Sequence, residues 1–505
     1  MTPGSVLGSF PFRRVAVVGL GRSGAAAARL LARSGVEVRV SERDDSPAVA
    51  GIAAELAALG VATELGPHRR GIVDGADALV VSPGVPPDNP VIVRALERGL
   101  PVWSEVELAW RLLTLIRSAS DRPPSSRGLA EGGEVPLLAV TGTNGKTTTT
   151  SLLAAILQAA GLRAVAAGNI GFPLVEAVAE LRPGGADAVE RDRVIVCEVS
   201  SFQLAFTETF RPDVAVVLNV ADDHYDWHRG YEDYLRSKAR IAAAQRPGDL
   251  LIANSADAGA MAIAAGAPSR TAAFGLGSLP SVRAASGSSG RSPVAVAGIE
   301  SGVIVAEGSA GGSAGGSAGP ASILEVGKIR LAGRHNLENV LAASLVALEW
   351  GVEPEVIGRA VAGFSPLPHR SAVIGEINGV RYVDDSKATN PHATLKALEG
   401  LERVVLIAGG RAKGLDLSVL TGQSPRLVGV IAMGEATGEL EGHFSRLVRF
   451  ATAGCVEEAV VLAAQWASAG DTVLLSPACS SLDQYSSYAE RGDRFCVAVR
   501  SLEAR

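Results

Sequence analysis

Short apolar runs alternate with Ala- and Leu-rich stretches along most of the chain. The run "VAVVG" at residues 15–19 is followed by "AAAARLLARSG" at 25–35 and by "VEVRVSE" at 36–42. This order predicts a β-α-β unit, and its repetition predicts parallel sheets with helices on both faces. A second series begins at "LLAVTG", residues 137–142, and a third includes "VVLIAGG", residues 404–410. The pattern therefore predicts the α/β fold class.

The length of the chain predicts several domains. Its 505 residues are too many for one hydrophobic core and suggest about three domains. We expect a Rossmann-like N-terminal domain, a central P-loop ATPase-like domain with a parallel sheet, and a Rossmann-like α/β C-terminal domain. The expected ranges are 1–104, 105–366 and 367–505. Flexible insertions are expected near 118–134 and within 280–322, because their Gly, Ser, Pro and Ala residues bury little apolar surface.

Composition narrows the possible function classes. A formal net charge of −6 with scattered basic residues and 4% aromatic residues provides no field or stacking platform for nucleic acid. No segment has the length and hydropathy of a membrane span, and "VAVVGLG" is interrupted too early for a signal peptide. The four cysteines contain no C-x-x-C pair, so reduced thiols are expected. A cytoplasmic protein without nucleic-acid or membrane partners is predicted.

The stretch "TGTNGKTTTT", residues 141–150, resembles a phosphate loop of unusual length. The usual loop has four residues between its first Gly and Gly-Lys-Thr, whereas Gly142 and Gly145 enclose only two. A strand precedes it and an amphipathic helix follows, so backbone N–H groups at the helix start favour an anion. Lys146 suits the β- and γ-phosphates and the Thr147 hydroxyl suits Mg²⁺. A plain Gly/Thr turn is the alternative, but the ordered combination favours a nucleotide site.

A second glycine-rich stretch, "GLGRSG", occupies residues 19–24. It follows a strand, opens a helix, and has Glu42 about twenty residues on, as in the dinucleotide-binding fingerprint. The physical requirement is only close approach of backbone to a diphosphate, which a UDP-sugar also contains. A diphosphate ligand of this kind is favoured over a redox dinucleotide or a purely structural turn.

Polar clusters follow several of the predicted strands. Glu198 ends an apolar strand, where a carboxylate can hold Mg²⁺ against the phosphates, although a surface or capping Glu is the alternative. "LNVADDHYDWH", residues 218–228, contains carboxylates and His224, which suit a cation bridged to substrate, although a lone His is more often a hydrogen-bonding loop residue. Lys238, on a helix of mixed polarity, would by itself be expected in solvent.

Three further clusters lie toward the C-terminus. Asn336 and Asn339 share a helix face at i, i+3 and suit a nucleobase or ribose, with helix capping as the alternative. The clusters "YVDDSKATNPHAT", residues 382–394, and "SPACSSLDQYSSYAERGDRF", residues 476–495, combine charged, hydroxyl and amide groups near strand ends. Two such clusters in one domain suggest a site for a small zwitterion.

Together these motifs resemble the Mur ligase family, the ATP-dependent amino-acid ligases of peptidoglycan synthesis. The resemblance covers nearly the whole chain in the family's order and includes "TGTNGKTT", "EVSSFQL", "GRHNLEN", "LPHR" and "DDSKATNP". "DDSKATN" differs from the string usual in the relatives that add alanine or a diamino acid. The resemblance therefore implies D-glutamate and UDP-N-acetylmuramoyl-L-alanine as substrates, ATP and two Mg²⁺ ions, and an acyl-phosphate intermediate. A monomer is expected.

The resemblance also implies roles for individual residues. Lys146, His224 and Lys238 are expected to be catalytic, with Lys238 carbamylated. Thr147, Glu198, His224 and the carbamate of Lys238 are expected to hold metal. Expected ATP contacts are Gly142, Thr143, Asn144, Gly145, Lys146, Thr147, Thr148, Asn336, Asn339, Arg370 and Asp385. Expected UDP-sugar contacts are Gly19, Leu20, Gly21, Arg22, Ser23, Glu42, Ser82, Pro83, Gly84, Asn169 and Ser200. Expected D-glutamate contacts are His369, Lys387, Thr389, Lys413, Ser481, Leu482 and Tyr488.

Two other classes of protein compete with this interpretation. An NAD(P)-dependent oxidoreductase would use "GLGRSG" but leaves the ATP loop and "EVSSFQL" unexplained. A nucleotide-gated binding module would leave the two C-terminal clusters without a role. NADPH binding would distinguish the first alternative, and phosphate release that depends on an amino acid would exclude the second.

Overall fold

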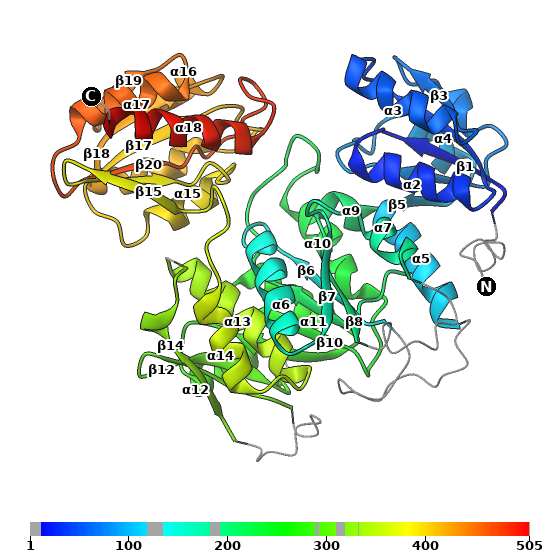
Figure 1. Ribbon diagram of the computed structural model, residues 1–505, viewed down its shortest axis with the longest axis horizontal. Helices are drawn as coiled ribbons and strands as arrows, with labels where there is room; N and C mark the ends of the chain where they lie inside the picture. Colours follow the sequence, from blue (N-terminus) through cyan, green and yellow to red (C-terminus); the bar gives the residue numbers. More distant parts are fainter. Residues whose placement is uncertain are drawn as a thin grey trace. The chain divides into compact units, whose positions relative to one another are not determined.

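The structure, a computed structural model, describes residues 12–118, 135–181, 192–287, 292–309, 319–331 and 333–503. It contains three sheets, each accompanied by helices (Figure 1). The chain forms two compact units. The first comprises Met1–Val220, Glu232–Lys328 and Glu338–Ala362, and the second comprises Ala221–Tyr231, Ile329–Leu337 and Gly363–Arg505. Among the described helices, none combines the length and the hydropathy that a membrane crossing requires.

The N-terminal sheet has five parallel strands in the order β3-β2-β1-β4-β5. Its strands are β1 (Arg14–Val18), β2 (Glu37–Glu42), β3 (Ala62–Leu65), β4 (Ala78–Val81) and β5 (Val102–Ser104). The helices are α2 (Arg22–Arg33), α3 (Pro47–Ala57) and α4 (Pro90–Glu97), with a 3₁₀ turn, η1 (Arg70–Val73). The strand order reverses between β1 and β4, which is where ligands bind in open α/β sheets. The "GLGRSG" loop leaves β1 and the "SPG" loop leaves β4 at this point.

The central sheet has nine strands in the order β14-β13-β12-β11-β10-β9-β6-β8-β7. Its strands are β6 (Leu137–Thr141), β7 (Arg163–Gly168), β8 (Arg193–Glu198), β9 (Val214–Val217), β10 (Leu250–Asn254), β11 (Arg270–Phe274), β12 (Val296–Glu300), β13 (Val303–Glu307) and β14 (Ala321–Glu325). The helices are α5 (Glu105–Ser118), α6 (Lys146–Ala159), α7 (Leu174–Ala179), α9 (Ser201–Ala205), α10 (Tyr231–Ala243), α11 (Ala258–Gly266), α12 (Leu279–Gly287), α13 (Arg334–Glu349) and α14 (Pro354–Gly363), with a 3₁₀ turn, η2 (Val326–Lys328). Strand β6 lies between β8 and β9, so polar residues after these three strands meet at one edge.

The expectation of parallel sheets needs one refinement in the central sheet. Strands β12, β13 and β14 are antiparallel and form its edge. The Gly/Ser/Ala segment connects β13 to β14, whose residues Ala306 and Ala321 are register partners. Ser309 donates hydrogen bonds to Glu349, with its N–H at 2.6 Å and its hydroxyl at 2.8 Å. Of the flexible insertions expected near 118–134 and within 280–322, residues 119–134, 288–291 and 310–318 lie outside the described residues, and most of 280–309 is helix or strand.

The C-terminal sheet has six strands in the order β15-β16-β20-β17-β18-β19. Its strands are β15 (Ala372–Ile377), β16 (Val380–Asp384), β17 (Val404–Gly409), β18 (Leu427–Met433), β19 (Arg449–Thr452) and β20 (Thr472–Leu475). The helices are α15 (Pro391–Leu398), α16 (Thr437–Phe444), α17 (Val456–Trp466) and α18 (Tyr488–Glu503), with a 3₁₀ segment, η3 (Leu417–Arg426). Alternate residues of β17 enter two separate hydrophobic clusters, so both faces of the sheet are buried. Because β20 lies between β16 and β17, the carboxyl ends of these three parallel strands are neighbours.

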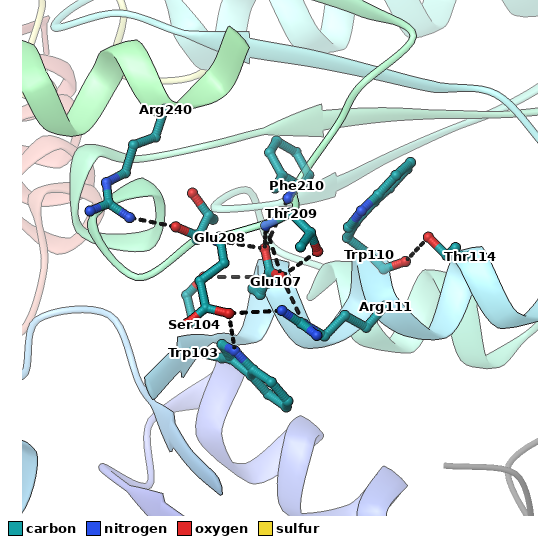
Figure 2. A network of polar contacts seen from close by, with 11 residues as sticks. Trp103, Ser104, Glu107, Trp110, Arg111, Thr114, Glu208, Thr209, Phe210 and Arg240 are labelled. Atoms are coloured by element: carbon teal, nitrogen blue, oxygen red, sulfur yellow. Dashed lines mark hydrogen bonds and ion pairs between the residues drawn. The ribbon is translucent and has the colours of Figure 1, made fainter. Parts of the chain in front are cut away.

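A buried carboxylate fastens α5 to the segment that follows α9 (Figure 2). Glu107 accepts hydrogen bonds from the N–H groups of Glu208, Thr209 and Phe210 at 3.0 Å each and from the Thr209 hydroxyl at 2.6 Å. Arg111 bridges Glu107 and Glu208, at 2.8 Å from each. The buried charge is thus fully paired, which is the condition under which a buried carboxylate is tolerated. This contact joins the start of the central domain to the connection between β8 and β9.

Candidate active site

The "GLGRSG" loop packs closely against the strand that neighbours its own. Gly19 has φ +88°, and a Cβ at this position would lie 2.6 Å from the Cβ of Ser82. Both the backbone conformation and the space therefore require glycine. Glu42 ends β2, accepts a hydrogen bond from the N–H of Leu20, and accepts another from the N–H of Asp44 at 2.9 Å. The loop opens α2, so its backbone N–H groups lie at a helix start that favours a diphosphate.

The "TGTNGKTT" loop has the same strand-loop-helix order as the "GLGRSG" loop. Gly145 caps α6 with φ +85°, and a Cβ there would lie 2.3 Å from the Oδ1 of Asn339. The same Asn339 oxygen accepts a hydrogen bond from the Thr149 hydroxyl at 3.2 Å. The loop is also tied to Asn219 after β9, whose Oδ1 accepts the N–H of Asn144 at 2.8 Å. Asn339, which was predicted to contact ATP, therefore lies directly beside the "TGTNGKTT" loop.

Two lysines converge on one carbonyl oxygen of this loop. The Nζ of Lys146 donates to the oxygen of Gly142 at 2.8 Å, and the Nζ of Lys238 donates to the same oxygen at 2.9 Å. Lys238 is 1% exposed, and its ammonium lies 4.5 Å from the ring centre of Tyr234. The expectation that Lys238 alone would lie in solvent is wrong. The physical reason is that α10 turns this position toward β6 and not outward. Two like charges within about 6 Å in a partly buried site repel each other.

Glu198 provides a carboxylate at the end of the neighbouring strand. Val140 and Glu198 are register partners of β6 and β8. The side chain is 2% exposed, its Oε1 accepts the Nδ2 of Asn169 at 2.8 Å, and its Oε2 has no hydrogen-bond partner among the described residues. A buried carboxylate oxygen without a partner fits a cation ligand, because otherwise it costs desolvation free energy. The half-buried Thr147 lies in the first turn of α6, which follows β6.

In the second unit, Asp223 anchors the "DDHYD" segment. Its Oδ1 accepts the Nζ of Lys413 at 2.7 Å, and its Oδ2 accepts the Nδ2 of Asn390 at 2.8 Å. Burial opposes the charged form, yet the Lys413 ammonium and His224 hold the pKa of Asp223 below its usual range. The N–H of His224 also donates to Asp223 Oδ1 at 2.8 Å. His224 and Lys413, both predicted site residues, therefore share one carboxylate.

Two further predicted residues of the C-terminal domain, Lys387 and His369, lie beside Tyr488. The Nζ of Lys387 lies 3.8 Å from the centre of its ring, and the His369 ring lies 6.3 Å away. His369 Nδ1 forms a hydrogen bond with Asp384 at 2.7 Å. Burial raises the pKa of Asp385 to about 7, although the hydroxyl of Ser476 donates to it at 3.0 Å. Cationic, aromatic and titratable groups thus gather at the carboxyl ends of β16 and β20.

The family of this chain follows from proteins that are similar to it over nearly its whole length. The UDP-N-acetylmuramoylalanine--D-glutamate ligase of Frankia casuarinae is 42% identical over 97% of this chain and 94% of its own length. The enzyme of the same description from Desulfosudis oleivorans is 39% identical and covers 97% of each chain. The chain belongs to the Mur ligase family.

Family models and a solved structure agree with this assignment. The Mur ligase MurD-like N-terminal domain matches residues 13–104, the Mur ligase middle domain matches 140–347, and the Mur ligase glutamate ligase domain matches 369–479. The crystal structure of MurF ligase from Thermotoga maritima in complex with ADP has a TM-score of 0.55 at 17% identity, over 92% of this chain and 96% of its own. The predicted three-domain α/β fold is thereby confirmed.

Within this Mur ligase, the predicted residues gather in groups. Lys146, Lys238 and Asn339 meet at the "TGTNGKTT" loop, and Glu198 lies one strand away. Asn169, predicted for the UDP-sugar, contacts the Glu198 carboxylate. The predicted metal ligand His224 belongs to the second unit, whereas the other three belong to the first.

Ser200, also predicted for the UDP-sugar, caps α9. Its hydroxyl accepts the N–H of Gln203 at 3.2 Å, and the Gln203 side chain accepts the N–H of Ser200 at 3.0 Å. This reciprocal capping box explains the residue type without a ligand. The UDP-sugar role of Ser200 stays a prediction.

Sequence reasoning missed several residues that shape the site. Tyr234 lines Lys238 and forms a hydrogen bond between its hydroxyl and that of Thr143 at 3.0 Å. Asn390 was predicted only as part of a polar cluster, and it donates a hydrogen bond to Asp223 across 167 residues. Arg491 is fully buried on α18. The position of Tyr234 four residues before Lys238 on one helix was a usable signal, because i and i+4 side chains are neighbours.

Proposed function

We propose that this Mur ligase joins D-glutamate to UDP-N-acetylmuramoyl-L-alanine at the expense of ATP, in peptidoglycan precursor synthesis. The relatives of that description support it, because they match over nearly the full length of both chains. The structural observation that carries it is the meeting of Lys146 and Lys238 on Gly142, one strand away from the unpartnered Glu198 oxygen. These are the groups that phosphoryl transfer to a carboxylate requires.

The first step activates the carboxylate of the alanyl group. A carboxylate oxygen attacks the γ-phosphorus of ATP, the bond to the β–γ bridging oxygen breaks, and ADP leaves with an acyl phosphate formed on the substrate. Lys146 neutralises charge on the transferring oxygens, and the N–H groups at the start of α6 orient the phosphates. Asn336, Asn339, Arg370 and Asp385 are proposed to contact the rest of ATP.

Magnesium is proposed to be held by Thr147 and Glu198, with a second ion held by His224 and a carbamate on Lys238. The ions supply positive charge to the phosphate oxygens. Carbamate formation joins the neutral amine to CO₂ and releases one proton, which converts the lysine from a cation to an anion. This proposal is supported by the two ammonium groups on one carbonyl oxygen, because carbamylation replaces their repulsion with attraction.

The second step forms the amide bond. The amine nitrogen of D-glutamate attacks the acyl carbon and loses a proton, and phosphate leaves from the tetrahedral intermediate. We propose that Lys387, Thr389, Lys413, Ser481, Leu482 and Tyr488 bind D-glutamate, with His369 beside them. The proximity of Lys387, His369 and Tyr488 supports one shared pocket. The boundaries of the three domains at residues 104 and 366 remain a proposal, as does a monomeric enzyme.

A phosphate-release assay tests this function. The protein is given ATP, Mg²⁺ and UDP-N-acetylmuramoyl-L-alanine with a panel of D- and L-amino acids. We expect release with D-glutamate at least tenfold faster than with any other member. Equal release without the nucleotide sugar, or release with L-glutamate alone, would contradict the proposal. NADPH serves as a control ligand, and saturable fluorescence would favour an oxidoreductase instead.

A further inference from the structure

A guanidinium group lies completely buried in the C-terminal domain, and no carboxylate of the described residues forms a hydrogen bond or ion pair with it. Arg491 of α18 is 0% exposed. All of its hydrogen bonds end on neutral oxygen atoms, and within the described part of the chain no ion pair forms with it. Burial lowers the pKa of Arg491 to about 10, so the group stays charged at neutral pH. A buried charge of this kind costs free energy, and its retention needs a compensating role.

The oxygen atoms that it binds belong to three different loops. Nη2 donates to the carbonyl of Ser386 at 2.9 Å and Nε donates to the Ser386 hydroxyl at 3.0 Å. Nη1 and Nη2 reach the carbonyl of Cys479 at 3.4 and 3.3 Å, and Nη1 reaches that of Gly409 at 3.4 Å. These residues follow or end β16, β20 and β17, which are adjacent parallel strands. One planar group thus spans the carboxyl edge of the sheet.

Each of these loops leads directly to a residue proposed to bind the amino acid. Lys387 follows Ser386, Ser481 comes two residues after Cys479, and Lys413 comes four residues after Gly409. Two of the loops are also paired with each other, since Arg411 and Ser480 exchange backbone hydrogen bonds of 2.9 Å. Movement of Arg491 would therefore change the relative positions of all three groups.

We propose that Arg491 is a positioning residue of the amino-acid site, which fixes the three loops relative to one another through its five-donor fork. The proposal rests on the function proposed above. A guanidinium is suited to the task because its N–H groups point in fixed, coplanar directions toward several acceptors. Lysine keeps the charge but offers no such fork.

The test compares Arg491→Ala and Arg491→Lys with Arg494→Ala as a matched control. Arg494 lies on the same helix, is 43% exposed, and pairs with Glu457 at 2.6 Å. For Arg491→Ala we expect KM for D-glutamate to rise at least 30-fold, while binding of ATP and of UDP-N-acetylmuramoyl-L-alanine changes less than threefold. Arg491→Lys should remain at least tenfold impaired, and guanidinium ion should partly restore Arg491→Ala. Arg494→Ala should resemble the wild type.

A milder variant and a measurement that needs no substrate keep the proposal testable even if Arg491→Ala misfolds. Ser386→Ala removes one acceptor and should raise KM for D-glutamate three- to tenfold. Hydrogen exchange of the free protein should become faster at residues 386–390, 409–414 and 479–482 in Arg491→Ala, and not in Arg494→Ala. Unchanged exchange in these loops, full activity of Arg491→Lys, or an equal loss of affinity for all three substrates without guanidinium rescue would overturn the proposal.

The two proposals fail in different ways. If the wild-type protein shows no phosphate release that depends on D-glutamate, the proposed function is wrong. In that case the exchange experiment still decides whether Arg491 fixes the loops. If the wild type is active with D-glutamate and the Arg491 variants keep their KM, only the positioning role is wrong.

Discussion

The two glycine-rich loops of the first unit share a local structure but differ in the charged side chains that distant parts of the chain bring to them. Each leaves a buried parallel strand, β1 or β6, and opens a helix, α2 or α6. In "GLGRSG", Gly19 packs against Ser82, and the one carboxylate contact, from Glu42, is made to a backbone N–H. In "TGTNGKTT", two lysines reach the loop and a carboxylate ends the neighbouring strand. The first arrangement is suited to holding a diphosphate, whereas the second is suited to transferring a phosphoryl group.

This difference separates the contribution of glycine to a phosphate site from the contribution of charged side chains. Glycine permits the backbone to approach a phosphate closely, and both binding sites and catalytic sites need this close approach. Catalysis in addition needs groups that stabilise charge developing in the transition state, and these come from side chains distant in sequence. A glycine motif alone therefore predicts a phosphate, and the side chains around it predict whether the phosphate reacts.

The largest effect is expected from Lys146→Ala. Ligation should fall at least 1,000-fold, because the variant loses the cation that is proposed to lie at the γ-phosphate, which amounts to about 4 kcal/mol of barrier. Binding of UDP-N-acetylmuramoyl-L-alanine, measured by calorimetry, should stay within twofold because its proposed loop is separate. Lys328→Ala, which removes an exposed lysine paired with Glu325 at 3.0 Å, is the control and should be fully active. Loss of both ligands in a folded Lys146→Ala protein would remove the distinction between the loops.

Lys238→Ala should reduce turnover at least 100-fold. If the residue is carbamylated, the variant lacks a carboxylate-like metal ligand in a buried site, and a short acid can take its place. We therefore expect acetate to restore part of the phosphate release and methylamine to restore none. The measurement is phosphate release across a series of short acids and amines at constant ionic strength.

The opposite pattern of rescue would identify Lys238 as a plain cation. Rescue by methylamine without rescue by acetate would mean that the second ammonium near Gly142 is needed as such. The "TGTNGKTT" loop would then hold two cations, Lys146 and Lys238, whereas the "GLGRSG" loop contains only Arg22. Mass spectrometry of the intact protein in bicarbonate buffer provides an independent check for the added mass of CO₂.

The local parts of this comparison could be predicted from the sequence, and the long-range parts could not. Strand, loop and helix around Gly19 and Gly142 follow from neighbouring residues, so the predicted elements agree with β1, α2, β6 and α6. The burial of Lys238 depends on how α10 lies against the loop that follows β6, because its acceptor, the Gly142 carbonyl, is 96 residues away in sequence. The pairing of Lys413 with Asp223 crosses 190 residues. Hydrophobic periodicity carries no information about such pairs, because many surface positions satisfy the same pattern.

Gly19→Ala should weaken the diphosphate site through the backbone alone. The positive φ and the 2.6 Å approach to Ser82 together should destabilise the fold by about 1–3 kcal/mol. KM for the nucleotide sugar should rise about tenfold and KM for ATP should not change. Gly35→Ala is the matched control, since Gly35 has φ +79° with nothing within 4 Å of an added Cβ. If the two variants have the same thermal stability and KM, close packing against Ser82 is not what shapes the loop.

The smallest effect is expected from Glu42→Gln. Its carboxylate accepts the N–H groups of Leu20 and Asp44, and the amide oxygen of glutamine can replace only part of this because hydrogen bonds to a charged acceptor are roughly twice as strong. KM for UDP-N-acetylmuramoyl-L-alanine should therefore rise about threefold, with kcat and KM for ATP unchanged. The variant separates two roles for this residue. A rise in this KM beyond thirtyfold in steady-state assays would show that Glu42 contacts the nucleotide itself. The site at the "GLGRSG" loop would then bind through a side chain as well as through the backbone.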